Sequence, residues 1–565
     1  MSRFKGNPWA VLIALCLGFF MILLDTTIVT IAVPAISDGL TASLDDILWI
    51  QSGYVLVYAV LLITAGRLGD MFGGKRIYLI GLVVFVLASA ACGLARNPDQ
   101  LIAARLVQGV GGALLSPQTL AIINRIFPPE RRGAAFGVWG AVAGVAAIAG
   151  PTLGGLLITY ASWEWIFYLN VPIGIVGFFL ATFLVPNIAE HRQHRLDVVG
   201  TALITVALFL VTYGLIEGEK YHWGRVWHFV SIPLIIAVGI ALVIVFLITQ
   251  YLAGRERPRR RPGRAGPVDP EQPDTRRKNE PLVPFTILRD RNYSLMNFVA
   301  MAMSFGMMGL FLPITIYLQS VLGLSAFDAG LTIAPMSLVS LVVAPFAGRL
   351  ADRIGGKYIL FAGLLLFAAG MALILQQSTV DSSRWTFLPG LLISGLGMGC
   401  IFAPMTTVAM RNIPAALSGA ASGVFNTTRQ LGAVVGSAAV GALLQAQLSS
   451  KLAASAQAHA DKVPPQFRAQ FVAGFSHSSG GLDVGSRQSQ VKAPPGMPQQ
   501  AVEQLKQIAA DTFHVGYVDA MRPTLILPIG VLVLAALSCL FIKRRSRSRA
   551  ATAPAVDAAT AEPAE

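Results

Sequence analysis

The feature that most constrains this chain is a short, charged, glycine-rich signature that occurs twice, 282 residues apart. The first copy reads Gly66-Arg-Leu-Gly-Asp-Met-Phe-Gly-Gly-Lys-Arg76 and the second reads Gly348-Arg-Leu-Ala-Asp-Arg-Ile-Gly-Gly-Lys357. Each copy lies between two long apolar runs, so it predicts a tight turn between two membrane-spanning helices. Its repetition indicates a duplicated helical membrane protein rather than one soluble core.

The composition of the chain agrees with a membrane protein. Hydrophobic residues make up 55% of the 565 residues and charged residues only 13%, which leaves too little polar surface to cover several soluble domains. The net charge of +14 would suggest nucleic-acid binding in a soluble chain. Here the basic residues gather in loops on one side of the predicted spans and in the tail 543–549, where anionic lipids attract them. We therefore expect a lipid bilayer, and no nucleic acid, as partner.

Fourteen apolar runs are long enough to cross a hydrocarbon core of about 30 Å as helices. We expect an all-α fold of six spans, two inserted spans and six further spans, with both termini and both repeated turns on the inner side because Lys and Arg are in excess there. The runs centre near residues 9–33, 47–66, 77–95, 99–123, 134–159, 165–186, 197–216, 229–252, 292–318, 327–348, 358–376, 386–409, 417–445 and 522–542.

The span assignment divides the chain into consecutive parts. They are an amino-terminal six-helix half (1–186), two inserted helices (187–252), a basic inner linker (253–291), a carboxyl-terminal half (292–542) that includes an outer segment (446–521), and a disordered inner tail (543–565). An amphipathic helix is expected from Gln499 to Phe513; it could cap an exit path or belong to a plain surface loop. The 33 Arg against 10 Lys favour a GC-rich bacterial genome and hence a cytoplasmic membrane.

In the repeated turn, glycines allow helices to approach and the chain to reverse, while Asp70 and Asp352 can accept hydrogen bonds from exposed N–H groups at helix amino termini. Such contacts can hold one conformation and break in another. The alternative is a basic loop that only sets membrane topology, which is less expected for two copies at matching positions. The residues assigned to this conformational switch are Gly66, Arg67, Gly69, Asp70, Gly73, Arg76, Gly348, Asp352 and Gly355.

Asp25 is the only carboxylate that the span assignment places well inside a helix. Burial in a bilayer favours the neutral acid, so we expect Asp25 to bind and release a proton as its access switches between the two sides. The alternative is a carboxylate bonded to Thr26, Thr27 or a neighbouring helix. Arg105, expected near the inner part of its span, also needs a carboxylate, a carbonyl or a cavity. It could equally tie its span to other helices.

Several stretches together resemble the major facilitator superfamily and, within it, the fourteen-span drug:proton antiporter family. They are the repeated turn, Leu24-Asp-Thr-Thr-Ile-Val-Thr-Ile-Ala-Val-Pro34, Leu101-Ile-Ala-Ala-Arg-Leu-Val-Gln-Gly-Val-Gly-Gly112, and the glycine-rich run 137–155. The resemblance covers nearly all of residues 9–445 and the last span. It implies two six-helix halves, export of drugs in exchange for protons, and a role for Arg105 in proton transfer.

The resemblance also implies a gate between the two halves in the fifth span. The physical basis is a helix face made smooth by glycines, with a proline that loosens the hydrogen-bond ladder. Glycine-rich packing without gating is the alternative. The residues assigned to this gate helix are Gly144, Gly150, Pro151 and Gly154.

Polar, aromatic and flexible side chains in mid-span are the candidates for substrate contact, although each taken singly is more often a packing residue. No further acid lies inside the second or thirteenth span, which weakens a preference for dications and favours neutral, amphipathic or monovalent cationic substrates. Arg429 resembles a recurrent arginine of the family whose role the sequence does not supply. The candidates are Gln51, Tyr54, Tyr58, Gln118, Met307, Asn426 and Arg429.

These observations predict a monomeric exporter that exchanges a small amphipathic substrate for protons and needs no metal, nucleotide or prosthetic group. Two alternatives remain open. The same fold could serve one endogenous lipid, siderophore or antibiotic, or the chain could be a receptor or scaffold that transports nothing. A membrane enzyme is less expected, because the spans contain no inward cluster of His, Cys or acids that resembles a catalytic set.

Overall fold

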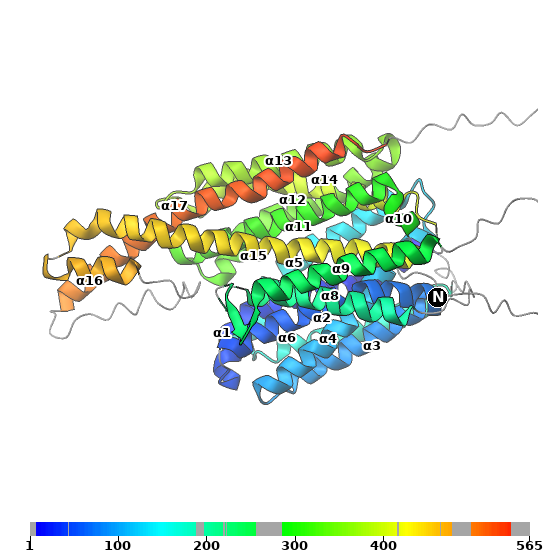
Figure 1. Ribbon diagram of the computed structural model, residues 1–565, viewed down its shortest axis with the longest axis horizontal. Helices are drawn as coiled ribbons and strands as arrows, with labels where there is room; N and C mark the ends of the chain where they lie inside the picture. Colours follow the sequence, from blue (N-terminus) through cyan, green and yellow to red (C-terminus); the bar gives the residue numbers. More distant parts are fainter. Residues whose placement is uncertain are drawn as a thin grey trace, which may run out of the picture.

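The computed structural model describes residues 7–42, 44–187, 197–218, 221, 223–255, 285–414, 417–463, 465–476 and 499–543. Long helices lie side by side along one axis (Figure 1), which confirms the all-α prediction. Among the described residues, thirteen helices are long and apolar enough to cross a membrane. A further helix of 29 residues, α5 (Arg132–Tyr160), lies in the same bundle and contains several residues whose side chains are not described.

The first half of the molecule, as the term is used below, comprises seven helices that carry the first six predicted spans. They are α1 (Pro8–Leu40), α2 (Leu44–Phe72), α3 (Gly74–Gly93), α4 (Pro98–Ile126), α5, α6 (Trp165–Tyr168) and α7 (Asn170–Leu184). Two of them begin in the same way. Asn7 and Asn97 accept hydrogen bonds from the N–H groups of Trp9 and Gln100, and a proline follows each cap. An asparagine cap followed by proline is a strong start signal for a helix.

The inserted pair lies against one side of this bundle. It consists of α8 (Val198–Glu217) and α9 (Ile232–Arg255), joined by a hairpin of β1 (Arg225–Trp227) and β2 (Val230–Ser231). Asp197 caps α8 by accepting from the N–H of Gly200, and its other carboxylate oxygen accepts from Gln250 of α9 at 2.7 Å. Apolar side chains of α8 and α9 pack on α2 and α15, while the rest of α9 keeps many apolar side chains exposed, as a lipid-facing helix does.

The second half contains the remaining helices. They are α11 (Arg291–Ile316), the π-helix η2 (Tyr317–Val321), α12 (Ala326–Ile354), α13 (Lys357–Gln377), the 3-10 helix η3 (Arg384–Phe387), α14 (Leu388–Met410), α15 (Ser418–His459), the 3-10 helix η5 (Ala460–Lys462), α16 (Pro465–Ser476) and α17 (Gln499–Cys539). The short helix α10 (Phe285–Arg289) precedes them.

The expected outer segment is helical wherever it is described. α15 and α17 are 42 and 41 residues long and extend well past the other helices, where α16 lies beside them (Figure 1). The amphipathic helix expected from Gln499 to Phe513 is the beginning of α17. This projecting segment has a small apolar core of its own, formed by Ala456, Val463, Phe471, Leu505 and Ala509. The rest of the expected loop, residues 477–498, lies outside the described residues.

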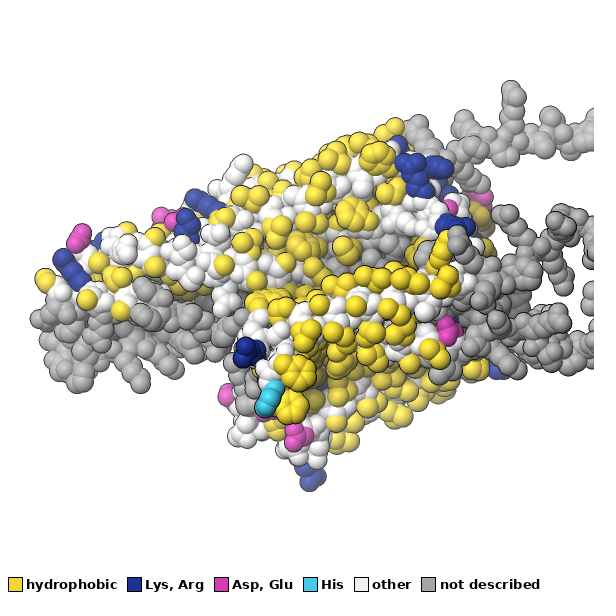
Figure 2. All heavy atoms as spheres, viewed as in Figure 1, with side chains coloured by type: hydrophobic (Ala, Val, Ile, Leu, Met, Phe, Trp, Pro, Cys, Tyr) yellow, Lys and Arg dark blue, Asp and Glu magenta, His cyan; other side chains and the backbone are white. Residues whose placement is uncertain are grey.

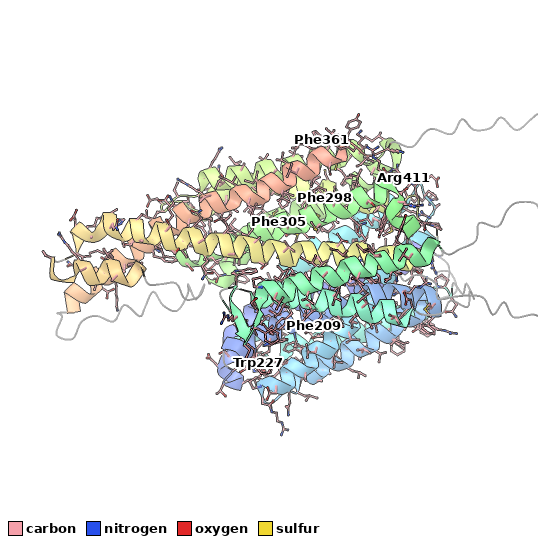
Figure 3. All side chains as sticks on the ribbon, in the orientation of Figure 1. Phe209, Trp227, Phe298, Phe305, Phe361 and Arg411 are labelled. Carbon is pink, nitrogen blue, oxygen red and sulfur yellow. The ribbon has the colours of Figure 1, made fainter. Side chains whose placement is uncertain are left out.

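The surface agrees with a bundle surrounded by lipid. Hydrophobic side chains cover the flank that faces the viewer in Figure 2, whereas charged side chains lie mainly toward the two ends of the long axis. Side chains mark the two ends in Figure 3: Trp227 of the hairpin lies at one end and Arg411 at the other, and Phe298 and Phe305 of α11 lie between them. Distributions of this kind are typical of multi-pass membrane proteins.

Both copies of the repeated signature are mostly helix, which corrects the prediction of a turn that begins at Gly66 and Gly348. α2 continues to Phe72 and α12 continues to Ile354. The chain reverses after single glycines, Gly73 with φ of 94° and Gly355 with φ of 88°. Only glycine adopts such angles without strain. The helices therefore end directly before these glycines, and the charged residues that precede them are helical.

The two halves meet mainly through two pairs of helices, with further contacts of α5 to α14 and of α4 to α15. α5 of the first half packs along α12 of the second, and α2 packs along α15. The end of the bundle that contains Gly73 and Gly355 is called the turn end below. Each copy of the signature therefore lies on a helix, α2 or α12, that takes part in the contact between the halves.

Candidate functional site

Asp25 lies in a buried polar cluster inside the first half. Its side chain, near the middle of α1, is 0% exposed. One carboxylate oxygen, Oδ2, accepts a hydrogen bond from Arg105 Nη1. The other, Oδ1, accepts from Gln108 Nε2 at 2.9 Å and from Asn170 Nδ2 at 3.4 Å. Both oxygens are therefore paired, as a charge buried at this depth requires.

Arg105 joins three helices. Besides Asp25, its guanidinium donates to the carbonyl of Ile50 at 3.0 Å and to Gln108 Oε1 at 2.8 Å. The guanidinium carbon lies 4.4 Å from the ring centroid of Tyr54, within the range of a cation–π contact. Arg105 and Gln108 share one face of α4, as their spacing predicts.

The position of Arg105 along its helix differs from the prediction. We expected it near the inner part of the fourth span, which is the side of the repeated turns. α4 begins at Pro98, where it follows α3 at the end of the bundle opposite to Gly73. Arg105 is only seven positions after Pro98 in a helix of 29 residues, so it lies in the half of α4 that is remote from the turn end.

Sequence reasoning missed two members of the cluster, Asn170 and Ser89. Asn170 Nδ2 donates to Ser89 Oγ at 3.1 Å as well as to Asp25, and Ser89 Oγ donates to the carbonyl of Phe167 at 2.9 Å. Both side chains are at most 1% exposed. An amide inside an apolar run was the available signal. Nothing in the sequence, however, pairs a residue of one helix with an acid 145 positions away.

The threonines that follow Asp25 do not hold its carboxylate. Thr26 and Thr27 donate instead to the carbonyl of Leu23, one turn back on the same helix, at 2.7 and 3.2 Å. Asp25 is instead bonded to side chains of neighbouring helices, which is the other possibility that the sequence left open for a structural carboxylate. The contacts themselves are those of an ion pair that ties α1, α4 and α7 together, and a role in proton transfer stays a proposal.

Asp70 connects the two halves at the turn end. Its carboxylate accepts from the N–H groups of Gly419 at 2.9 Å and Ala420 at 2.7 Å, the first residues of α15. Arg125 of α4 donates to Asp70 at 2.9 Å and to Ser418 at 3.0 Å. An acid at a helix amino terminus satisfies free N–H groups and complements the helix dipole.

Asp352 makes the same contact in the opposite direction. It accepts from the N–H groups of Gly133 at 2.9 Å and Ala134 at 3.1 Å, at the beginning of α5. An acid of the second half thus caps a helix of the first half, and Asp70 caps a helix of the second half. Asp70 and Asp352, two of the residues that sequence analysis assigned to a switch, thus lie on the interface that a switch would have to open.

The glycines of the signature allow the halves to touch. A side chain on Gly66 would collide with the backbone carbonyl of Gly419, and its Cβ would lie only 3.1 Å from the Cα of Gly423. A side chain on Gly348 would collide in the same way with the carbonyl of Gly133. The helix pairs α2–α15 and α12–α5 therefore approach at backbone distance.

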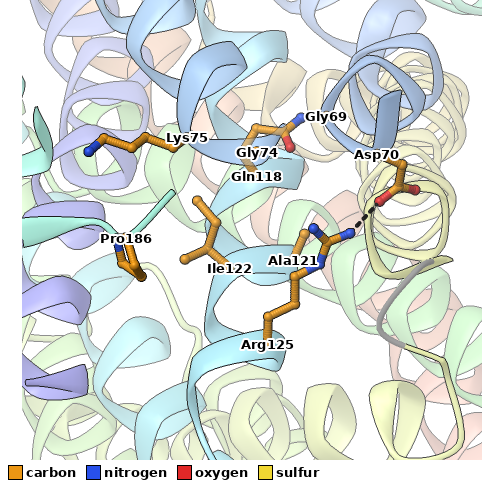
Figure 4. Close-up of a pocket in the computed structure, with 9 residues that line it drawn as sticks. All are labelled: Gly69, Asp70, Gly74, Lys75, Gln118, Ala121, Ile122, Arg125 and Pro186. Carbon is orange, nitrogen blue, oxygen red and sulfur yellow. Dashed lines mark hydrogen bonds and ion pairs between the residues drawn. The ribbon is translucent and has the colours of Figure 1, made fainter. Parts of the chain in front are cut away.

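Four residues of the first signature, Gly69, Asp70, Gly74 and Lys75, line a small cavity at the turn end, drawn in Figure 4. Gln118 and Arg125 also contribute to its lining. Gln118 donates to the carbonyl of Ala65 at 2.7 Å and leaves no room for a side chain on Gly69. Of the two arginines assigned to the switch, Arg67 is 1% exposed, whereas Arg76 is exposed.

The predicted substrate contacts do not form one lining in this conformation. Tyr54 is fully buried beneath Arg105, and Gln118 lies at the turn end. Asn426 is buried and donates to Ser422 of its own helix at 2.9 Å. Gln51 and Met307 are half-buried.

Tyr58 meets two other candidates, Tyr54, whose ring centroid lies 6.1 Å from its own, and Arg429. Tyr58 donates to Ser116 at 3.1 Å, and the Arg429 guanidinium interacts with the Tyr58 hydroxyl across the interface between the halves. Arg429 also lies 5.8 Å from the ring centroid of Trp139, which stacks on Phe19 at 4.3 Å. Sequence analysis missed the two aromatic residues because apolar side chains in a span carry no distinguishing signal.

The glycines of α5 face two different neighbours. A Cβ on Gly137 would lie 2.7 Å from the carbonyl of Ala344, and one on Gly144 would lie 2.9 Å from the carbonyl of Ser337, both in α12. Gly150 instead contacts Thr27 of α1, and Gly154 is buried. α5 stays helical through Pro151, whose side chain is not described. The smooth face between the halves is present, and its use as a gate stays a proposal.

Comparison with known proteins decides the family. The sequence profile of the Major Facilitator Superfamily matches residues 15–265 and 200–437 of the chain. The chain belongs to the major facilitator superfamily. Together the two overlapping matches cover most of both halves, so the family assignment applies to the whole bundle.

Curated relatives of this major facilitator protein are of similar extent. An MFS-type transporter of Mycobacterium tuberculosis is 40% identical over 452 residues, which is 80% of this chain and 73% of the relative. The tetracenomycin C resistance and export protein of Streptomyces glaucescens is 33% identical over 453 residues, which is 79% of this chain and 78% of that protein.

A solved structure has the same fold. The major facilitator proton:xylose symporter XylE matches with a TM-score of 0.56 and 14% sequence identity, covering 96% of both chains. At this identity the likeness shows the fold alone. Family and fold together indicate a multi-pass membrane transporter that moves small substrates, rather than an enzyme.

Proposed function

We propose that this major facilitator protein exports amphipathic small molecules across the cytoplasmic membrane of a bacterium in exchange for protons. The observation that carries the proposal is the fully buried Asp25, held by Arg105, Gln108 and Asn170. An intramembrane acid with a named partner is a functional residue by default. The name of the Streptomyces relative, a resistance and export protein, supports the direction of transport.

The contacts of Asp25 explain how protonation could be coupled to movement. The ion pair with Arg105 exists only while Asp25 is ionised. When Asp25 is neutral, Arg105 keeps the carbonyl of Ile50 and the ring of Tyr54 but loses its counter-charge. The two protonation states therefore favour different arrangements of α1 and α4, which is what a ligand-driven equilibrium needs.

The turn end supplies the two-state element. In the structure, Asp70 and Asp352 hold the halves together there through four N–H groups of α15 and α5. We propose that these contacts break when the turn end opens, and that the amino terminus and the turn end face the cytoplasm. Asp25 would then bind a proton from outside and release it inside as substrate loads. A membrane potential adds about 2.3 kcal/mol per charge per 100 mV, enough to tip a balanced equilibrium.

The proposed substrate surface lies between the halves. Tyr58 and Arg429 meet there, and we assign half-buried Gln51 and Met307 to the same surface. Tyr54, Gln118 and Asn426 are fully buried and would reach a substrate only after the helices move. We propose neutral or monovalent cationic substrates, and a monomer as the functional unit, with α5 as the gate helix.

The test uses purified protein in liposomes that contain a pH-sensitive dye, with ethidium, tetraphenylphosphonium and a neutral steroid as probes. Proton movement that depends on a probe is expected for the native chain and lost in Asp25→Asn. Asp38→Asn is the matched control, because Asp38 lies on the same helix but is exposed. Substrate movement that ignores the pH gradient, or full coupling in Asp25→Asn, would refute the proposal.

One observation favours a second candidate, a dedicated exporter of an endogenous lipid, siderophore or antibiotic. α15 and α17 are about twice as long as a membrane crossing requires, and the projecting segment could guide such a cargo away from the membrane. Transport of a fluorescent lipid but of no drug in the same liposomes would favour this candidate. A complete absence of transport with intact binding would instead favour a receptor.

A further inference from the structure

Asn170, a member of the cluster around Asp25, has one polar atom that its contacts do not explain. Asn170 Oδ1 is buried and has no hydrogen-bond partner in the structure, although the Nδ2 of the same amide donates to both Asp25 and Ser89. A buried acceptor without a donor costs free energy. Such an atom needs a reason to be retained at this position.

A protonated carboxyl group supplies the missing donor. An ionised carboxylate only accepts hydrogen bonds, whereas a carboxylic acid carries one O–H donor. An amide offers a donor at one end and an acceptor at the other, and a half-turn about its last side-chain bond exchanges the ends. Asn170 can therefore serve Asp25 with Nδ2 when the acid is charged and with Oδ1 when it is neutral.

Ser89 allows the amide to turn. Its hydroxyl now accepts from Asn170 Nδ2 and donates to the carbonyl of Phe167 at 2.9 Å. Because a hydroxyl both donates and accepts, Ser89 can instead donate to Asn170 Oδ1 once the amide has turned. No other group has to move, although the carbonyl of Phe167 gives up the Ser89 hydroxyl and Nδ2 takes the unpaired position that Oδ1 now occupies.

We propose that Asn170 is a positioning residue that pairs with Asp25 in both protonation states, with the Ser89 hydroxyl as the adaptable second partner. This inference rests on the proposed function, because it concerns the proposed proton site. It differs from that function in naming the group that accepts the proton of the neutral acid inside the membrane, because Arg105 carries only donors and cannot do so.

The surroundings of Asp25 contain few other groups that could respond to pH. The charged and titratable side chains that interact with Asp25 among the described residues are Arg105 from α4, Tyr54 from α2 and Cys92 from α3. Arg105 keeps its charge at all relevant pH values. Tyr54 and Cys92 are fully buried and neutral in their ordinary forms near neutral pH. A shift in titration caused by a change at Asn170 would therefore be a shift in the titration of Asp25.

The test follows Asp25 directly, without a substrate, by infrared titration of the purified protein. The carboxylic-acid C=O band that is lost in Asp25→Asn is assigned to Asp25. In Asn170→Leu the charged form loses a donor that the native protein supplies, so the titration midpoint should rise by about one pH unit. The band should also move, because the acid has lost the acceptor for its proton. Asn170→Asp should raise the midpoint further, since two nearby carboxyls resist joint ionisation.

Two further variants separate positioning from packing. Ser89→Ala should shift the midpoint in the same direction as Asn170→Leu, by a smaller amount. Asn297→Leu is the matched control: Asn297 is a buried asparagine of the second half that donates within its own helix and also leaves Oδ1 without a partner. Asn297→Leu should leave the midpoint unchanged. Melting temperatures of all variants show whether each one folds.

The possible outcomes are distinct from those of the proposed function. A midpoint and band in folded Asn170→Leu identical to those of the native protein would overturn the inference even if transport proves to be proton-coupled. Conversely, a shifted midpoint in a protein whose transport ignores the pH gradient would support the pairing of Asn170 with Asp25 and refute coupling. A loss of transport in Asn170→Leu that is equal at every pH, with an unchanged midpoint, would assign Asn170 to packing alone.

Discussion

The two halves of the molecule are alike at the turn end and different in the membrane interior. Asp70 of the first half caps α15, and Asp352 of the second half caps α5 with the same pair of backbone contacts. Deeper in the bundle, the first half buries the ion pair of Asp25 and Arg105. In the second half, no carboxylate is among the buried side chains that the structure describes, and the charge of Arg429 in α15 lies against Tyr58 of the first half.

This difference separates two tasks. Closing the turn end requires each half to hold the other, so both copies of the signature are used. Binding a proton requires one site only, and the site that we propose lies in the first half. Duplication therefore preserved the element that both halves need, while the interior diverged. Three experiments test how far this division holds, in addition to those at Asp25 and Asn170.

The largest effect is expected for Arg105→Leu, which leaves the carboxylate of Asp25 buried without its counter-charge. Removing one partner of a buried ion pair costs about 3–5 kcal/mol, so the melting temperature and proton-coupled transport should both fall sharply. The double variant Asp25→Asn with Arg105→Leu should regain stability but not coupling. Stability that stays low in the double variant would show that Arg105 acts mainly through packing. Arg522→Leu, at an exposed arginine of the second half, is the control.

Next in size is the effect of a side chain on the interface glycines. Gly66→Leu and Gly348→Leu should each prevent closure of the turn end, because both positions touch backbone of the other half. Because the two glycines make equivalent contacts, we expect the two substitutions to open the turn end equally. Spin labels at Phe72 and Ile354, which are 55% and 64% exposed and flank the two turns, report the opening as a distance. A much larger effect in one half would break the symmetry at this end.

The smallest effect distinguishes the two acids. Buried Asp70 is paired with Arg125 in addition to its two N–H groups, whereas the charge of Arg411 is the smallest of the influences on half-buried Asp352. Hydrogen bonds to charged groups contribute about 1.5–3 kcal/mol. Asp70→Asn should therefore open the turn end about tenfold more than Asp352→Asn, measured with the same labels. Arg125→Gln should lower the free energy that Asp70 contributes to closure of the turn end to about that contributed by Asp352. Equal opening in both aspartate variants would show that the arginine contributes nothing to closure.

Much of the fold could be predicted from the sequence because helices that cross a membrane must be long and apolar. The residues at which those helices end were harder to predict. The charged residues of the signature look like loop residues, and the prediction stopped the second span at residue 66. In the structure Arg67 and Asp70 remain in α2, since Asp70 finds partners between the halves and only Gly73 breaks the helix.

The candidate site divides in the same way. Asp25 and the two signature acids could be selected because acids next to or inside a span are rare and costly. Their partners could not be selected, because Asn170, Ser89 and the amino terminus of α15 are brought to them only by tertiary packing. Mid-span polarity also failed to separate Tyr58, which meets Arg429, from Gln118, which lies at the turn end.

One helix links the turn end to the far side of the molecule. α15 begins beside Asp70 and continues without interruption to His459 in the projecting segment. At 1.5 Å per residue its 42 residues span ~63 Å. A tilt of ~10° about its capped end would displace the opposite tip by ~11 Å. Release of Asp70 at one membrane face would thus displace the projecting segment beyond the other face.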